Sequence, residues 1–162
     1  MATLERAISI AAEAHAGQID KAGKAYILHP LRVMLSLSTD QERIVGVLHD
    51  VVEDCKAWTF SRLADEGFSD EIILALKSVT KHEPNKNPVI LVGSTESDEE
   101  PYEDFIRRAA ANKIGAKVKR ADLLDNMDLS RIAEPTDNDL ARMIRYKNAL
   151  KILVAETGMD CQ

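Results

Sequence analysis

The stretch Leu48-His49-Asp50-Val51-Val52-Glu53-Asp54 (residues 48–54) places one imidazole and three carboxylates inside an apolar, helix-forming segment. On a continuous helix, side chains four positions apart share a face, so we expect His49 over Glu53 and Asp50 over Asp54. Burying these groups without partners would cost several kcal/mol, and a bound cation would remove that cost. The stretch therefore favours a metal site. The alternative, acids that end a helix in solvent, is disfavoured by the helix dipole.

Length and composition are those of one globular domain, which we expect to span residues 1–162. The chain is 45% hydrophobic and 30% charged, and its net charge of −6 argues against a nucleic-acid polymer as partner. A small anionic substrate remains compatible, because a metal and a few cations invert the local field. Cys55 and Cys161 form no CxxC pair, so we expect a reducing, cytoplasmic location. No signal-like or membrane-spanning apolar run is present, so no membrane partner is expected.

Hydrophobic periodicity predicts helices along most of the chain. The expected ranges are residues 3–16, 30–38, 40 to about 55, 60–66, 70–81, 102–111, 113–132 and a final helix that ends before Gly158. The expected N-caps are Thr3, Asp40, Thr59 or Ser61, Ser69, and Asp137 or Asn138. The predicted fold class is all-α, a bundle of about seven or eight helices.

Residues 82–101 are rich in turn-forming side chains and are expected to form a long irregular loop. A loop of this length in a compact domain is typical of a lid or a mobile element. Its apolar residues 89–92 suit either a short strand or a latch on the core. The latch is favoured, because a lone strand has no partner. The acidic residues 98–100 are expected to start the next helix.

Histidines elsewhere in the chain offer further ligands. His29 precedes Pro30, which suits the first turn of a helix, so the His29 ring is expected at a helix start. The alternative is a surface loop histidine. His15 lies on the apolar face of the first predicted helix, and we expect a core histidine with a satisfied hydrogen bond rather than a ligand.

A second acidic group follows on a later helix. Asp122, Asp125 and Asn126 are spaced three and four positions apart, so they point in nearly one direction. Two imidazoles and two carboxylates from three helical segments would suit Mn²⁺ or another borderline metal. That candidate set is His29, His49, Asp50 and Asp122.

Five segments carry a wider pattern in order along residues 4–132. They are Ala14–Gln18 (AHAGQ), Tyr26–Leu31 (YILHPL), Leu48–Asp54 (LHDVVED), Val79–Lys81 (VTK) and Ala121–Met127 (ADLLDNM). This pattern resembles the hydrolase domain of RelA/SpoT-type enzymes, a branch of the HD-domain metal-dependent phosphohydrolases. The resemblance implies a compact HD-domain helical bundle. Given the chain length, it is closest to the single-domain small alarmone hydrolases.

The resemblance also implies an activity, the hydrolysis of guanosine 3′,5′-bis(diphosphate)-type alarmones (ppGpp) with release of the 3′-pyrophosphate and with one Mn²⁺ per chain. It implies that the metal ligands are His29, His49, Asp50 and Asp122. It implies that Glu53 and Asp54 position and activate water or protonate the leaving group. Metal-bound water of lowered pKa and carboxylates that relay protons agree with such chemistry. The resemblance implies Asn126 as a substrate contact, and Tyr26 in the matched segment 26–31 is a further expected contact. Lys21 is expected as a third contact that offsets phosphate charge, as Lys24 or Arg107 could, and for each of these cations a surface role is the alternative.

Two positions depart from the family pattern. Asp20 stands where an arginine is common, which leaves the choice between guanine and adenine open. Asp125 stands where the family usually has histidine. Two alternatives therefore stay open: an HD phosphohydrolase acting on another nucleotide, such as an adenosine alarmone or a nucleoside monophosphate, and a non-catalytic nucleotide sensor. Glu53 and Asp54 argue against the sensor, which needs no proton-transfer acids. Monomer and homodimer are both open.

Overall fold

The structure is a computed structural model that describes residues 1–81, 100–132 and 134–159. These residues form α-helices and one 3₁₀ turn, with no strand among them, so the predicted all-α class is confirmed. None of the described helices combines the length and the apolar character that a membrane span requires. The predicted latch at residues 89–92, most of the predicted loop and the start of the acidic run lie outside the described residues.

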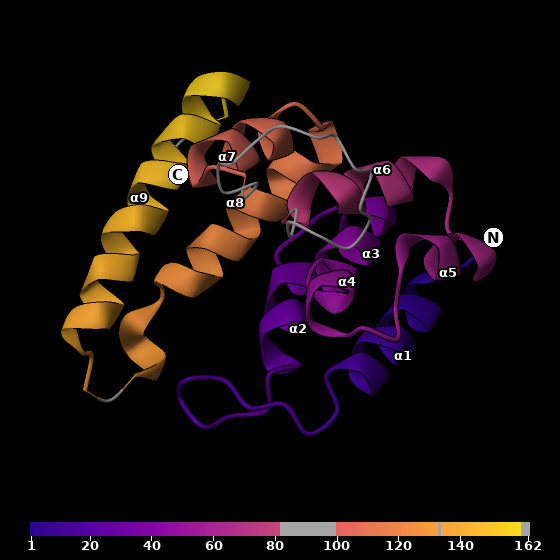
Figure 1. Cartoon of the computed structure of the whole chain (residues 1–162), viewed down its shortest axis with the longest axis horizontal. Coiled ribbons are helices and arrows are strands. Elements are labelled where there is room, and N and C mark those ends of the chain that lie inside the picture. The colour runs from indigo at the N-terminus through magenta and orange to yellow at the C-terminus, as the bar shows by residue number, and fades with distance from the viewer. Residues whose placement is uncertain (82–99, 133, 160–162) are drawn as a thin grey trace, which may run out of the picture.

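The helices follow the predicted order. They are α1 (Leu4–Ala14), α2 (Leu28–Leu35), α3 (Asp40–Leu48), α4 (Val51–Asp54), α5 (Phe60–Asp65), α6 (Asp70–Val79), α7 (Tyr102–Ala110), α8 (Lys113–Met127), the 3₁₀ turn η1 (Leu129–Arg131) and α9 (Asp137–Thr157). In Figure 1, α9 runs along one flank of the molecule and α1 and α5 lie on the other. Helix α8 lies between them and packs against both α3 and α9.

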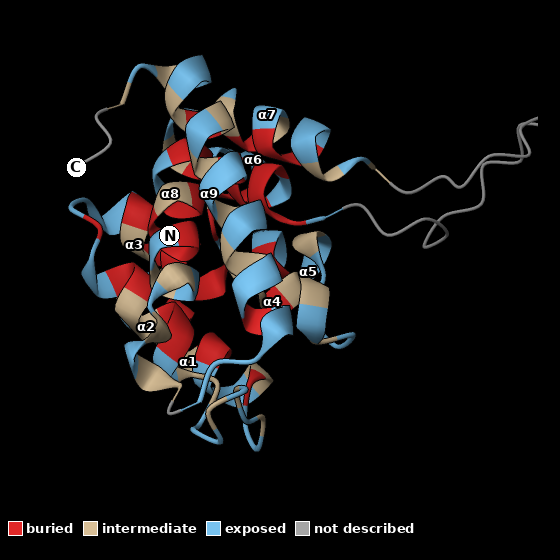
Figure 2. Ribbon diagram, turned by 90° about the vertical axis from the view of Figure 1, so that its left-hand side faces the viewer, coloured by how far each residue is buried: buried red, intermediate tan, exposed pale blue. Residues whose placement is uncertain are grey.

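Two apolar clusters hold the helices together, and α8 contributes to both. Val118 and Ala121 belong to the larger cluster, which is built mainly from α1 to α6. Ala116 and Leu123 belong to the smaller cluster, which is completed by α7 and α9. Figure 2 shows the buried residues gathered on the inward faces of the helices. One face of α8 packs into the larger cluster and another into the smaller one. The polar ligand candidate Asp122 lies on the helix between these two apolar faces.

Two predicted N-caps are wrong by one or two residues. Thr39 caps α3: its Oγ1 accepts the N–H of Glu42, and the Glu42 carboxylate accepts the N–H of Thr39, each at 3.2 Å. Thr136 caps α9 in the same reciprocal way with Asp139. Such a capping box needs an acid three residues after the threonine, which both segments contain. The predicted caps Thr3, Thr59 and Ser69 are confirmed.

The predicted continuous helix through residues 48–54 is also wrong. Helix α3 ends at Leu48 and α4 begins at Val51, so His49 and Asp50 form the turn between them. The His49 ring donates through Nδ1 to the carbonyl of Gly46 at 2.8 Å. A continuous helix would use that carbonyl for the N–H of Asp50. The interruption matters because it turns both side chains toward one point. Similarly, α8 ends at Met127 rather than near residue 132, and η1 follows it.

Candidate metal centre and substrate cavity

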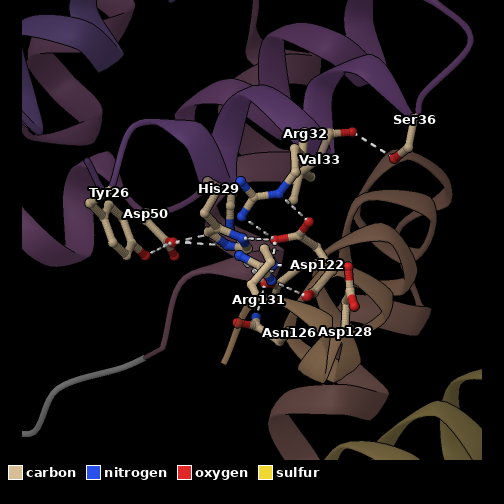
Figure 3. Close-up of polar contacts among 12 residues, drawn as sticks. Tyr26, His29, Arg32, Val33, Ser36, Asp50, Asp122, Asn126, Asp128 and Arg131 are labelled. Atoms are coloured by element: carbon tan, nitrogen blue, oxygen red, sulfur yellow. Dashed lines mark hydrogen bonds and ion pairs between the residues drawn. The ribbon is translucent and has the colours of Figure 1, made fainter. Parts of the chain in front are cut away.

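Three segments that are distant in sequence meet at one buried point (Figure 3). His29 lies in the first turn of α2, His49 and Asp50 occupy the α3–α4 turn, and Asp122 projects from α8. His29, His49 and Asp122 are only 6%, 2% and 5% exposed. The structure therefore brings together the four residues that the sequence singled out as candidate ligands.

The ligand atoms of these residues face one another. His29 Nε2 lies 3.3 Å from Asp122 Oδ1 and 3.7 Å from Asp50 Oδ2. His49 Nε2 lies 3.1 Å from Asp50 Oδ2 and 3.6 Å from Asp122 Oδ1. One ligand atom each of His29, His49 and Asp122 falls within 4.8 Å of the other two. His49 Nε2 is buried, and although Asp50 Oδ2 lies near it, no hydrogen bond of normal geometry reaches this nitrogen from the described residues, which suits a cation at this point.

The outer nitrogen of each imidazole is already used. His29 Nδ1 lies 2.6 Å from Asp125 Oδ2, and His49 Nδ1 lies 2.8 Å from the carbonyl of Gly46. When Nδ1 carries the proton, the lone pair of Nε2 faces the centre, as in metal-ligating histidines. Two imidazole nitrogens with two carboxylates form a donor set that fits a divalent transition metal.

Neighbouring side chains orient the two carboxylates. The Tyr26 hydroxyl donates to Asp50 Oδ2 at 2.5 Å. Asn126 Nδ2 donates to Asp122 Oδ1 at 2.6 Å, and Lys119 Nζ donates to Asp122 Oδ2 at 2.8 Å. Lys119 was not singled out from the sequence. Its position three residues before Asp122 on one helix is the signal that would have found it.

In the absence of a cation, protons on the imidazoles balance the acids. Burial would lower the pKa of His49, but the charges of Asp50 and Asp122 outweigh it and hold the pKa well above 6.5. The pKa of His29 is likewise raised, against burial, by Asp122 and Asp125. Burial would raise the pKa of Asp122, but Lys119 and the imidazoles hold it well below its usual value. A divalent cation would take the place of the protons on the two imidazoles.

The two predicted catalytic acids lie beside this centre. Glu53 lines the adjoining cavity, and its Oε2 accepts the N–H of Lys81 at 3.3 Å. Burial raises the pKa of Glu53, and the charge of Asp50 adds to the effect. Partial burial of its carboxyl group, followed by the charge of Asp50, also raises the pKa of Asp54. The residue as a whole remains open to solvent and does not line the cavity. Both groups hold a proton more readily than an ordinary carboxyl group does.

A cavity of about 400 Å³ opens from the centre toward α9. The predicted substrate contacts Lys21, Tyr26 and Asn126 line it, whereas Lys24 does not. Arg107 also lies outside the lining, because its guanidinium pairs with Glu103 and Asp104 on the surface of α7.

Most of the positive charge in the cavity comes from residues that the sequence reasoning missed. The lining cations are Lys21, Lys81, Lys119, Arg131, Arg142 and Arg145, and the lining rings include Tyr102, Phe105 and Tyr146. Arg142, Arg145 and Tyr146 recur at helical spacing on α9, which predicts a shared face but not what that face meets. The lining also holds six acids, Asp20, Asp50, Glu53, Asp122, Asp128 and Asp139, which match the cations in number. A divalent metal at the centre would tip this balance toward the positive charge that suits an anionic nucleotide, and the rings offer aromatic walls.

Two further positions, His15 and Asp20, have clear structural roles. His15 is buried, as predicted, with Nδ1 2.9 Å from Gln18 Oε1 and its ring against Tyr26 at 5.0 Å. Its Nε2 has no hydrogen-bond partner among the described residues, so the predicted satisfaction is only partial. Asp20 lines the cavity, and its Oδ1 accepts the N–H groups of Ala22 and Lys24, each at 2.9 Å.

In this helical domain, His and Asp side chains converge from an early helix, a His-Asp turn and a distal helix. This is the arrangement of an HD-type metal centre.

No protein-family model matches the chain. The chain is 32% identical over 139 residues to a probable GTP pyrophosphokinase of Mycobacterium leprae, a match that covers 83% of this chain and 17% of that protein. It is 30% identical over 131 residues to a guanosine-3′,5′-bis(diphosphate) 3′-pyrophosphohydrolase of Aquifex aeolicus, covering 76% and 17%.

A protein of the same name from Spiroplasma citri is 39% identical over 82 residues, which cover 48% of this chain and 11% of that protein. The chain is therefore a homologue of RelA/SpoT-family proteins, as its motifs predicted. The match spans only 17% of the Mycobacterium and Aquifex proteins, so the chain corresponds to one part of those relatives.

Proposed function

We propose that this chain acts as one HD-type domain that hydrolyses guanosine 3′,5′-bis(diphosphate)-type alarmones with the help of Mn²⁺ and releases the 3′-pyrophosphate. The observation that carries the proposal is the convergence of two imidazole nitrogens and two carboxylates at the end of a cavity lined by lysines and arginines as well as acids. The Aquifex and Spiroplasma relatives are named for this hydrolysis. The Mycobacterium relative is named for a pyrophosphokinase, and a His/Asp metal centre favours the hydrolytic reaction over that one.

The residues at the centre would hold one metal ion. His29, His49, Asp50 and Asp122 supply the ligands, and a bound metal would lower the pKa of a water molecule and offset charge on a phosphoryl oxygen. Hydrogen bonds from Tyr26 to Asp50 and from Lys119 to Asp122 fix the orientation of the two carboxylates toward the metal centre. The site is therefore ordered before substrate arrives, which reduces the reorganisation required during reaction.

The remaining lining residues would bind and orient the nucleotide. Glu53 would accept a proton from the attacking water or return one to the leaving group, a role that its hydrogen bond from the N–H of Lys81 and its raised pKa support. Asp54 is a second proton carrier at the surface. Arg145 on α9 would offset phosphate charge, as would Arg142, whose guanidinium also pairs with Asp139. Tyr146 offers a ring to the base or ribose.

The test is a pyrophosphate-release assay on the purified chain with the guanosine alarmone and Mn²⁺. We expect release that a chelator stops and that Asp50→Ala lacks. Asp40→Ala, which removes an exposed acid at the start of helix α3, the helix that ends just before the His49–Asp50 turn, serves as the matched control and should keep the activity. Substrate bound by a metal-loaded protein without release of pyrophosphate would contradict the proposal and favour the nucleotide sensor.

A second candidate substrate is the adenosine analogue of the same alarmone. The specific observation is Asp20, which stands at the cavity wall where the family commonly has an arginine. Its carboxylate orders the turn at residues 20–24, so this position presents no cation to a base. Running the same assay with both alarmones decides between them: a larger kcat/KM for the adenosine compound would assign the chain to that substrate.

A further inference from the structure

Both ring nitrogens of His29 contact carboxylates of one helix, α8. Asp122 on α8 approaches Nε2 at 3.3 Å, and Asp125, one turn further along α8, lies 2.6 Å from Nδ1. We propose that Asp125 is the positioning residue that fixes the His29 ring for metal binding, and that Arg32 and Arg131 hold Asp125 in place. This inference rests on the proposed function, because it takes His29 as a metal ligand.

Two helices supply this arrangement by matching spacings. His29 and Arg32 are three residues apart on α2, and they face Asp122 and Asp125, three residues apart on α8. Arg32 binds Asp125 as a fork, with Nε 2.6 Å from Oδ1 and Nη2 3.0 Å from Oδ2. A bidentate guanidinium–carboxylate pair fixes orientation as well as charge. The α2–α8 contact thus sets the angle of the ring.

Arg131 of η1 completes the support. Its Nη2 donates to the backbone carbonyl of Asp125 at 2.5 Å and lies 3.3 Å from Asp125 Oδ2. The Asp125 carboxylate therefore meets two guanidinium groups and one imidazole (Figure 3 shows both arginines beside His29). Because the arginines neutralise it, Asp125 adds no net negative charge to a centre that already holds two carboxylates.

Asp125 does not touch the substrate cavity, which separates its role from catalysis. It lines a different cavity of about 670 Å³ between α2, α3 and α8, together with Arg32. Arg131, in contrast, lines the substrate cavity. Asp125 therefore acts through His29. Donation of the Nδ1 proton to Asp125 leaves the lone pair of Nε2 for the metal, the usual function of a carboxylate behind a ligating histidine.

The test measures metal binding without any nucleotide, by calorimetric titration of the metal-free protein with Mn²⁺. Asp125→Asn should weaken the affinity by roughly 10–100-fold, the usual loss when a carboxylate behind a ligating histidine is removed. Arg32→Lys keeps the positive charge but loses the two-point contact with Asp125, so its Mn²⁺ affinity should lie between those of wild type and Asp125→Asn. If Asp125→Asn does not fold, the Mn²⁺ affinity of Arg32→Lys tests the inference instead.

The matched control is Glu42→Gln. Glu42 is also a buried acid in an ion pair with a cation on α8, Lys117, and lines the same second cavity, but it does not contact His29. This variant should lower the thermal midpoint and leave Mn²⁺ affinity within about twofold of wild type, because distant sites act independently.

Wild-type Mn²⁺ affinity in Asp125→Asn would overturn the inference, as would an equal loss of affinity in Glu42→Gln. Either result would leave the proposed hydrolysis standing. Conversely, a wild-type chain that binds Mn²⁺ but releases no pyrophosphate would refute the proposed function, while the effect of Asp125→Asn on Mn²⁺ affinity would still support the positioning role.

Discussion

Replacing Asp122 by alanine should destabilise the metal-free protein in addition to abolishing metal binding. Asp122 and Lys119 form an ion pair at 2.8 Å, and their side chains are only 8% and 10% exposed. Burial would lower the pKa of Lys119, but the charge of Asp122 outweighs it and keeps the pKa raised, so the ammonium group is charged. Without Asp122, this charge stays buried against the Phe105 ring, 4.8 Å away.

The size of the effect follows from the burial of the pair. Removing one partner of a buried ion pair costs roughly 3–5 kcal/mol. For a domain of this size, that corresponds to a fall of roughly 6–20 °C in the thermal midpoint. The double variant Asp122→Ala/Lys119→Met removes both charges and restores apolar contact. It should recover most of the stability, because a buried pair replaced by apolar side chains is often neutral.

Urea unfolding in a chelator measures the stability, and calorimetric titration with Mn²⁺ measures the binding. The single variant should lose both, and the double variant should regain stability alone. Asp104→Ala removes the acid of an exposed ion pair with Arg107 and should cost about 0–1 kcal/mol. Wild-type stability in Asp122→Ala would refute the reasoning about Lys119. Wild-type Mn²⁺ affinity in the double variant would remove Asp122 from the ligands.

The other predictions concern the remaining ligands and acids. Glu53→Gln should keep Mn²⁺ affinity but lose pyrophosphate release, and unchanged turnover would exclude Glu53 from the mechanism. Asp50→Ala should abolish Mn²⁺ binding while the circular dichroism of the helices persists; full activity would contradict its assignment as a ligand. In a chelator, the free energy of unfolding should fall as pH rises above 6.5. Although burial opposes it, the nearby carboxylates raise the pKa of His29 and of His49 above 6.5, so their contribution is complete below that pH and is lost as pH passes the folded-state values. A flat profile between about pH 6.5 and about pH 9 would argue against protonated imidazoles in the metal-free centre.

Local sequence signals predicted most of the helices, because periodicity and capping act over a few residues. The errors arose where two local signals compete. Asp40 looks like an N-cap, but Thr39 has Glu42 three residues later and forms the reciprocal box. Helical periodicity continues through residues 48–54, yet the His49 ring takes the carbonyl of Gly46 and ends the helix. In both cases a side chain competes for a backbone group, which periodicity does not register.

The candidate ligands were available from motif order, but their supports were not. Arg32 lies 93 residues from Asp125 in sequence, and no local pattern pairs them. The cations on α9 meet the cavity only because α9 packs against α7 and α8. Sequence motifs therefore identified which side chains are candidate metal ligands. The packing of the helices decides which neighbouring side chains orient those ligands and shift their pKa values.

Helix α8 explains why the centre requires the whole domain. Its ligand and support residues, Lys119, Asp122 and Asp125, follow a three-residue spacing along one face. The neighbouring faces pack into the larger cluster through Ala121 and into the smaller one through Leu123. Since His29 and His49 belong to elements packed within the larger cluster, whereas the cavity wall of α9 belongs to the smaller one, α8 is the element that aligns metal ligands with substrate contacts. A displacement of α8 would therefore disturb both at once.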